Sequence, residues 1–368
     1  FSASSKPHPD TRMAQTKPPV FLRVEQPDSI VHVIVEFNEP PLLLSTRSSR
    51  ISTPASFYRE RFARFAQDAN RLGPSTLTAH PRAEFYKLFF GVGITIENHK
   101  IGSIEQLPYV RRVHSEKRYR ALGTQGLATR RSPEDSDTSA MEGDGVLVGI
   151  IDSGVDYLHP ALGGGIGPGF KVVGGFDFVN GDPDPMDDNG HGTHVAGIVA
   201  ADGVSFRGVA PKAKILAYKV LNAAGQGSDL DIIAALERSA DPNQDGDPAD
   251  MPDILNLSLG SDFGDPDDPV STAVDNAVRL GMTVCVAAGN AGWYTPVQGK
   301  EGNYYFTGME TIASPGTARL AITVGAVDSL GRITRFSSKG PSAGIFAIKP
   351  DVVAPGEGIW SLAPGGTM

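Results

Sequence analysis

The sequence contains very little cysteine and no long apolar segment. Cys285 is the only cysteine among 368 residues, which excludes an internal disulfide framework. No apolar run approaches the roughly 20 residues that a membrane-spanning helix needs, so we expect no membrane partner. Glycine and proline, in contrast, are frequent, with 43 and 28 residues, and they predict many turns and loops.

The length and the charge distribution predict two unequal domains. A chain of 368 residues suffices for one large domain and one small one. Residues 1–131 contain 20 Lys and Arg against 11 Asp and Glu, and residues 132–368 contain 13 against 31, so their net charges of +9 and −18 sum to −9. The basic residues form no compact stripe, so we expect no nucleic-acid partner. A basic front domain that docks on an acidic back domain explains the asymmetry.

The first third of the chain has the pattern of a small α+β domain. Residues 1–28, rich in Ser, Pro and Lys, indicate a flexible leader. A β-branched strand follows at Ile30–Phe37, then a helix with an apolar face, one or two strands within Phe85–Ile96, a short helix opened by Ser103, and a closing strand over Tyr109–Tyr119. The apolar face comprises Tyr58, Phe62, Phe65, Ala69 and Leu72. This order predicts a ferredoxin-like front domain over residues 29–122.

A polar linker over residues 123–144 separates this unit from a different pattern. Near-continuous apolar strands are expected at Gly145–Asp152, Lys214–Val220, Ile254–Leu257, Thr283–Ala287 and Ala321–Ala326. Helices are expected between them at Gly192–Ala201, Ser228–Ala240 and Asp267–Leu280. Alternating strands and helices predict an α/β back domain over residues 145–368, with a doubly wound, mostly parallel sheet.

Three polar side chains follow the expected carboxyl ends of strands in the back domain. Asp152 ends one strand, a helix starts just after His191, and Asn290 ends another strand segment. Carboxylate, imidazole and amide together are the groups that acyl transfer needs for orientation, proton transfer and oxyanion stabilisation. Taken singly, Asp152 and Asn290 also fit turn or cap positions. His191 with His194 also fits a metal pair, although the H-E-x-x-H pattern is absent.

The motifs around these residues resemble the subtilisin-like serine proteases (subtilases, peptidase family S8). The stretches are "VGIIDSGVD", "NGHGTHVAGIVA", "GVAPKAKILAYKVL", "NLSLGS" and "VAAGN". The resemblance implies that Asp152 is the triad aspartate, His191 the general base and Asn290 the oxyanion donor. It also implies a secreted serine endopeptidase with peptide or protein substrates and no cofactor required for the chemistry.

The same resemblance assigns two strand edges to substrate binding. These edges are Gly225, Gln226 and Gly227 on one side and Ser258, Leu259 and Gly260 on the other. An extended peptide would add to both edges as a strand, with side-chain pockets supplying selectivity. Simple turn chemistry is the alternative interpretation of these glycines.

The front domain resembles the inhibitory propeptides (inhibitor I9-like) of the same proteases. The resemblance implies that this domain is an intramolecular partner whose C-terminal end, at about His114–Leu122, blocks the cleft, with processing somewhere in residues 119–145. An unrelated ferredoxin-like binding module is the alternative.

A structural calcium ion is a further hypothesis. Asp241, Asn243, Asp245 and Asp247 alternate around Gly246, as in the first half of a calcium loop. Pro252 stands where such a loop has its bidentate glutamate, and an acidic solvated turn is the alternative.

The nucleophile is expected outside this sequence. Subtilases carry the serine in Gly-Thr-Ser-Met-Ala, at a regular interval after a turn that corresponds here to Val353–Gly356. That interval puts the serine about seven residues beyond Met368, so that "PGGTM" precedes the nucleophile loop. The sequence is therefore interpreted as a zymogen fragment, inactive by itself. An inactive peptide-binding pseudoprotease, an inhibitor-type module and a calcium-dependent structural domain are the alternatives.

Overall fold

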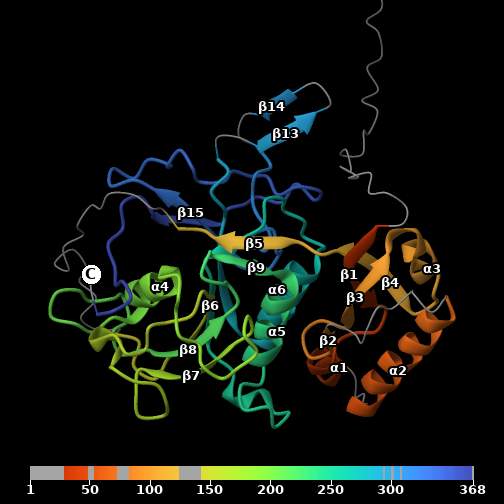
Figure 1. Cartoon of the computed structure of the whole chain (residues 1–368). Coiled ribbons are helices and arrows are strands. Elements are labelled where there is room, and N and C mark those ends of the chain that lie inside the picture. The colour runs from red at the N-terminus through yellow and green to blue at the C-terminus, as the bar shows by residue number, and fades with distance from the viewer. Residues whose placement is uncertain are drawn as a thin grey trace, which may run out of the picture.

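A computed structural model describes residues 29–48, 54–72, 83–123, 142–292, 295–299, 302–306 and 309–366. The leader expected over residues 1–28 lies outside these ranges, as does most of the linker expected over residues 123–144. The described residues form four sheets. The two largest, of four and seven strands, are the centres of two units, and one strand crosses from the first unit onto the second (Figure 1).

The front domain is an antiparallel sheet covered by helices. Its elements are β1 (Ile30–Phe37), α1 (Leu42–Ser48), α2 (Ala55–Arg71), β2 (Ala83–Phe85), β3 (Gly91–Glu97), α3 (Ile101–Glu105) and β4 (Val110–Ser115). The strand order is β2-β3-β1-β4. Helix α2 buries Tyr58, Phe62, Phe65 and Ala69, the apolar face expected from the sequence. Because that face packs on the inner face of the sheet, this unit has a core of its own.

Two expectations for the front domain are wrong in detail. Helix α3 begins at Ile101, directly after a 3-10 turn at Asn98–Lys100, so Ser103 lies inside the helix and is not its cap. Strand β4 ends at Ser115 instead of continuing to Tyr119. The chain leaves the sheet there because Lys117 bonds to carboxylates of the back domain.

The back domain is built on a seven-stranded parallel sheet. Its strands are β6 (Leu147–Asp152), β7 (Val172–Asp177), β8 (Lys214–Lys219), β10 (Ile254–Leu257), β12 (Thr283–Ala287), β15 (Ile322–Val327) and β16 (Val352–Pro355). The order is β16-β15-β12-β10-β6-β8-β7, and every neighbouring pair is parallel. The doubly wound α/β fold is thereby confirmed. Sequence reasoning missed β7, which contains Gly174 and Gly175, and β16, an edge strand that ends in a proline.

Helices cover both faces of this sheet. Helix α4 (His191–Ala200) packs on the face to which Val148 and Ile150 of β6 point. Helices α5 (Asp229–Ser239) and α6 (Pro269–Leu280) cover the face to which Ile151 points. Neighbouring β6 residues thus belong to opposite cores, since successive side chains of a strand alternate. All three helices begin within two residues of the sequence-based expectation.

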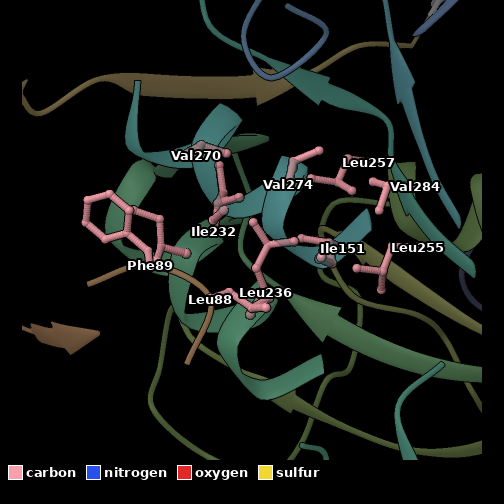
Figure 2. Packing of buried hydrophobic residues seen from close by; sticks show 14 of the residues in the cluster. Leu88, Phe89, Ile151, Ile232, Leu236, Leu255, Leu257, Val270, Val274 and Val284 are labelled. Atoms are coloured by element: carbon pink, nitrogen blue, oxygen red, sulfur yellow. The ribbon is translucent and has the colours of Figure 1, made fainter. Parts of the chain in front are cut away.

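The front domain docks on α5 and α6. Leu88 and Phe89 join the same buried cluster as Ile232 of α5 and Val270 of α6 (Figure 2). The chain then continues as β5 (Arg118–Ala121), which runs across the back domain between β9 (Gln226–Ser228) and β11 (Leu259–Gly260) (Figure 1). A hairpin of β13 (Thr295–Gly299) and β14 (Gly302–Phe306), not expected from the sequence, projects beyond the sheet. No helix in the described ranges is long and apolar enough to cross a membrane.

Candidate active site

Asp152 and His191 meet at the carboxyl edge of the sheet. Asp152 is the last residue of β6 and is fully buried, and His191 is the first residue of α4. His191 Nδ1 lies 2.7 Å from Asp152 Oδ1, and the Ser153 amide donates to the same oxygen. With Nδ1–H donating to the carboxylate, Nε2 of the imidazole is the nitrogen that accepts a proton.

The environment prepares His191 to act as a base. Burial alone lowers the pKa of His191, but the charge of Asp152 and its hydrogen bond more than offset this, and the pKa rises above its ordinary value. His194, one helical turn further on, bonds through Nε2 to the Ile359 carbonyl, and burial lowers its pKa. The two imidazoles thus have separate partners, and this does not favour the metal-pair alternative.

Asp187 holds the loop that carries His191. Its Oδ1 accepts hydrogen bonds from Ser153 Oγ and the amides of Asn189 and Gly190, and its Oδ2 accepts from the amide and hydroxyl of Thr193. Five donors converge on one buried carboxylate, which ties the start of α4 to the residue after Asp152. Sequence reasoning missed this role, although Asp187 lies four residues before His191.

Lys219 is a buried cation beside the same loop. Its Nζ donates to the carbonyls of Ser153 and Leu221 and to Asp188 Oδ1, 2.5 Å away, and the residue is 1% exposed. An ammonium group with three acceptors compensates for its loss of hydration. Lys219 therefore orders the backbone that follows Asp152.

Asn290 lies at the same edge of the sheet as the carboxylate–imidazole pair. It follows β12, and β12 and β6 flank β10 on either side. The Asn290 residue is exposed. The turn before it requires glycine, because Gly289 has φ 114° and a Cβ there would lie 2.6 Å from Ser338 Oγ. Its amide is therefore accessible to a substrate oxygen.

A segment of the front domain occupies the cleft beside these residues. We name residues 116–123 the tail segment. Within it, β5 pairs antiparallel with both β9 and β11. The Ala121 amide donates to the Gly225 carbonyl at 3.0 Å, and the Leu122 amide donates to the Ser258 carbonyl at 2.8 Å.

The residues expected to bind substrate all lie along the two edges that flank the tail segment. Tyr119 lies opposite Gly227, Arg120 opposite Gln226 and Gly260, and Ala121 opposite Leu259. Glycine is favoured at three of these positions. Gly225 has φ 70°, a Cβ on Gly227 would collide with the Val220 carbonyl oxygen, and one on Gly260 would lie 2.9 Å from Ala313 Cβ.

The end of the tail segment lies against the imidazole. The Leu122 backbone lies close enough to His191 to contribute to the raised pKa of the imidazole. A Cβ on Gly123 would lie 2.6 Å from His191 Cδ2 and 2.7 Å from Nε2. The peptide bond between Leu122 and Gly123 is therefore the part of the chain that the candidate base approaches. In the part of the chain that the structure describes, no serine hydroxyl bonds to this imidazole.

The candidate calcium residues bond mainly among themselves. Asn243 Oδ1 accepts from the Asp245 amide, Asp245 Oδ1 accepts from the Asp247 amide, and Asp241 Oδ2 accepts from Lys87 Nζ. Among the described residues, no group of three or more His, Cys, Asp or Glu side chains is arranged to hold a metal ion. Asp241 instead contacts the front domain, and a structural calcium ion stays a hypothesis.

Three carboxylates that contact the front domain were not singled out in the sequence. Glu237 of α5 accepts hydrogen bonds from the amides of four consecutive residues, 86–89. Asp229 and Asp268, at the starts of α5 and α6, bond to Lys117. Their only sequence signal is the net charge of opposite sign on the two halves of the chain. That signal predicts docking without identifying the partners.

Asp229 gives the chain a pH dependence that can be measured. Burial, aided by the nearby charges of Glu116 and Asp268, raises the pKa of Asp229 from 3.8 to about 7. The folded state then binds more protons than the unfolded state, so this stability is present below pH 4 and lost as pH rises through about 7. We expect the unfolding free energy to decrease by about 4 kcal/mol across this window through Asp229 alone.

Unfolding in urea between pH 4 and pH 8 checks this expectation. Asp229→Asn, which has no titrating carboxyl, should flatten the profile, whereas Asp144→Asn on an exposed turn should keep the wild-type slope. An unchanged slope in Asp229→Asn would contradict the assignment.

The fold and the geometry together define a class of protein. A buried carboxylate bonded to an imidazole, beside a cleft that holds an extended strand, is the arrangement of a peptidase domain of the serine type. The chain belongs to the subtilase family, whose family model (Peptidase_S8, Subtilase family) matches residues 143–367.

Two relatives in sequence, given first, agree with this membership. The chain is 37% identical over 269 residues to "Serine protease AprX" of Bacillus subtilis, covering 69% of this chain and 56% of that protein. It is 32% identical over 288 residues to "Subtilisin E" of the same species, covering 77% and 66%. A solved structure titled a cold adapted subtilisin-like serine proteinase is 28% identical, with a TM-score of 0.49, covering 67% of this chain and 74% of that one. The chain spans little more than half the length of AprX.

Proposed function

We propose that this chain is the zymogen part of a serine endopeptidase that hydrolyses peptide and protein substrates. The observation that carries the proposal is the tail segment, which pairs with both cleft edges and presents its Leu122–Gly123 bond to His191. Subtilase membership supports peptidase activity in general. In this proposal the front domain is a propeptide that inhibits the enzyme in cis until it is cleaved.

The mechanism follows from the atoms at the site. The serine hydroxyl, proposed to lie about seven residues beyond Met368 by the family's spacing, attacks the carbonyl carbon of the scissile bond while His191 Nε2 accepts its proton. Asp152 stabilises the imidazolium, and Asn290 donates a hydrogen bond to the oxyanion. The imidazolium then gives its proton to the leaving amine, and water hydrolyses the acyl-serine with the same base.

We further propose that the mature enzyme acts outside the cell. One relative, "Minor extracellular protease Vpr" of Bacillus subtilis, is 41% identical over 196 residues, half of this chain and 21% of that protein. Fractionation of the source culture, followed by mass spectrometry of the medium, tests this location. Recovery of the processed form only from cells would contradict it.

Self-processing between Leu122 and Gly123 is the expected outcome that tests the function. The full-length gene product should yield a mature form that begins at Gly123, because that bond lies against His191. N-terminal sequencing and intact mass measurement identify the new terminus.

The His191→Ala variant of the same full-length protein is the control and should stay uncleaved. Cleavage of that variant at the same bond would mean that another protease acts there. A full-length wild-type protein that neither processes itself nor hydrolyses casein would favour the pseudoprotease alternative.

A further inference from the structure

An acidic segment of the back domain forms one wall of the cleft around the tail segment. It runs over residues 261–268, between β11 and α6, and contains four aspartates. Three of them bond to basic residues of the front domain: Asp262 to Arg120, Asp265 to Arg112, and Asp268 to Lys117. The fourth, Asp267, bonds to Arg319 within the back domain.

These three contacts differ in strength. Arg120 and Asp262 are both exposed, with 57% and 64% of their side-chain surface accessible, and such pairs contribute little in water. Arg112 lies 3.9 Å from Asp265 and belongs to β4, outside the tail segment. An extended peptide bound in place of the tail segment therefore has no residue that corresponds to Arg112. Asp268, in contrast, is 2% exposed, and its Oδ2 lies 2.8 Å from Lys117 Nζ. Because Asp268 is buried and the Lys117 side chain is only 27% exposed, this pair carries most of the charge recognition.

A second buried carboxylate holds the backbone of the same residue. The Lys117 amide donates to Asp229 Oδ2 at 2.8 Å, and Asp229 is 1% exposed. Among the residues that the structure describes, Asp229 Oδ1 and the Tyr119 hydroxyl, both buried, have no hydrogen-bond partner. Lys117 is therefore fixed at its side chain and at its main chain, by residues that begin two different helices of the back domain.

Removal of the front domain takes away the groups that donate to these two carboxylates. Asp268 Oδ2 loses the ammonium group, and Asp229 Oδ2 loses the amide. With the front domain in place these carboxylates are buried, and its departure leaves them without these two donors; a substrate that supplies a cation and an amide at the same places restores the pairing. With the scissile bond after Leu122, Lys117 is the sixth residue on the amino-terminal side of that bond.

We propose that the mature protease selects substrates with a lysine or arginine at the sixth position before the scissile bond, through Asp268. This inference rests on the proposed function. Asp268 is a specificity-determining residue in this assignment, with Asp229 holding the main chain of the same substrate residue. The basic residue at the third position, the counterpart of Arg120, contributes much less.

Peptides with the sequence of residues 116–122, followed by p-nitroanilide, test the proposal on the processed full-length enzyme. The parent peptide has lysine at the sixth position, and its partner has norleucine, which keeps the aliphatic chain and lacks the charge. We expect kcat/KM to be about tenfold lower for the norleucine peptide, mainly through KM, as is typical when one charged hydrogen bond is lost. Replacement of the third-position arginine by norleucine should change kcat/KM by at most about threefold.

The Asp268→Asn variant tests whether the Asp268 carboxylate causes the preference for lysine. The variant keeps Oδ1, which accepts from the Ser271 amide at the start of α6, and replaces the Oδ2 that accepts from Lys117 by an uncharged NH2 donor. It should process the lysine and norleucine peptides with similar kcat/KM, whereas Asp267→Asn should keep the tenfold ratio. A double-mutant cycle that combines Asp268→Asn in the enzyme with the lysine-to-norleucine change in the peptide gives the coupling free energy between Asp268 and that lysine.

Three outcomes overturn the proposal. Equal kcat/KM of the wild-type enzyme for the lysine and norleucine peptides overturns the proposal, even where Asp268→Asn fails to fold. The proposal is also overturned if a folded Asp268→Asn variant keeps the wild-type ratio of kcat/KM between the two peptides. If the wild-type enzyme hydrolyses neither heptapeptide nor Ala-Leu-p-nitroanilide, the proposed function itself fails and this inference fails with it. Hydrolysis of the short peptide without a lysine preference overturns the inference alone.

Discussion

Replacing Asp152 by asparagine is expected to slow self-processing of the full-length protein about 10⁴-fold, the loss typical of a triad carboxylate changed to an amide. Asp152 Oδ1 accepts from His191 Nδ1 at 2.7 Å and so leaves Nε2 free to take a proton. An asparagine amide favours the opposite tautomer, in which Nε2 carries the proton and is no longer a base.

The pH dependence of self-processing should also change in Asp152→Asn. Burial lowers the pKa of His191, and the Asp152 charge and hydrogen bond outweigh this and raise it. Wild-type processing needs neutral His191 and should therefore decline as pH falls through this raised pKa. In Asp152→Asn the raising contribution is lost, and the midpoint of the decline should move to lower pH.

Single-turnover processing, followed by mass spectrometry between pH 5 and pH 9, measures both effects. Asp144→Asn, the same chemical change on an exposed turn, should behave as wild type. An Asp152→Asn rate within tenfold of wild type would mean that the pair at 2.7 Å does not perform the chemistry.

Replacing Glu237 by alanine is expected to loosen the front domain from the back domain. The two carboxylate oxygens accept from the amides of Tyr86, Lys87, Leu88 and Phe89 at 2.5 to 3.0 Å. Leu88 and Phe89 are buried, so their amides would lose the acceptor without free access to water. We expect a cost of about 3 kcal/mol to docking, which increases the open population about 100-fold.

Hydrogen exchange of these four amides measures the effect directly. We expect their protection in Glu237→Ala to fall about 100-fold, while the amides of β1, held by both neighbouring strands, keep theirs. Glu237→Gln should lie between wild type and Glu237→Ala, since one acceptor oxygen remains. Glu105→Ala, on an exposed helix end, is the matched control. Unchanged protection of residues 86–89 in Glu237→Ala would contradict a docking role for this carboxylate.

Local patterns predicted most of the scaffold. The strand at Ile30–Phe37 and the parallel strands at Lys214 and Thr283 were read from β-branched and apolar runs, and the structure has them within about one residue at each end. Helix α2 was read from its apolar spacing. Weak local signals account for the misses: β7 carries two glycines, and β16 is a short edge strand. The end of β4 was wrong because contacts outside its own sheet decide it.

By itself, the sequence determined the fold class and the subtilase resemblance, and it predicted Asp152, His191 and Asn290 as the candidate catalytic residues. These features are recognised from short motifs and from the periodic spacing of apolar residues, and both are local properties of the sequence. Only the tertiary structure decided which bond faces His191, which carboxylates receive the front domain, and where the candidate calcium residues bond. The contacts between the front and back domains that involve Lys117 and Leu88 join residues more than 100 positions apart, Lys117 with Asp268 and Leu88 with Glu237. Packing selects such pairs, because no local pattern marks one acidic side chain among 42 Asp and Glu as the partner of a particular amide or ammonium.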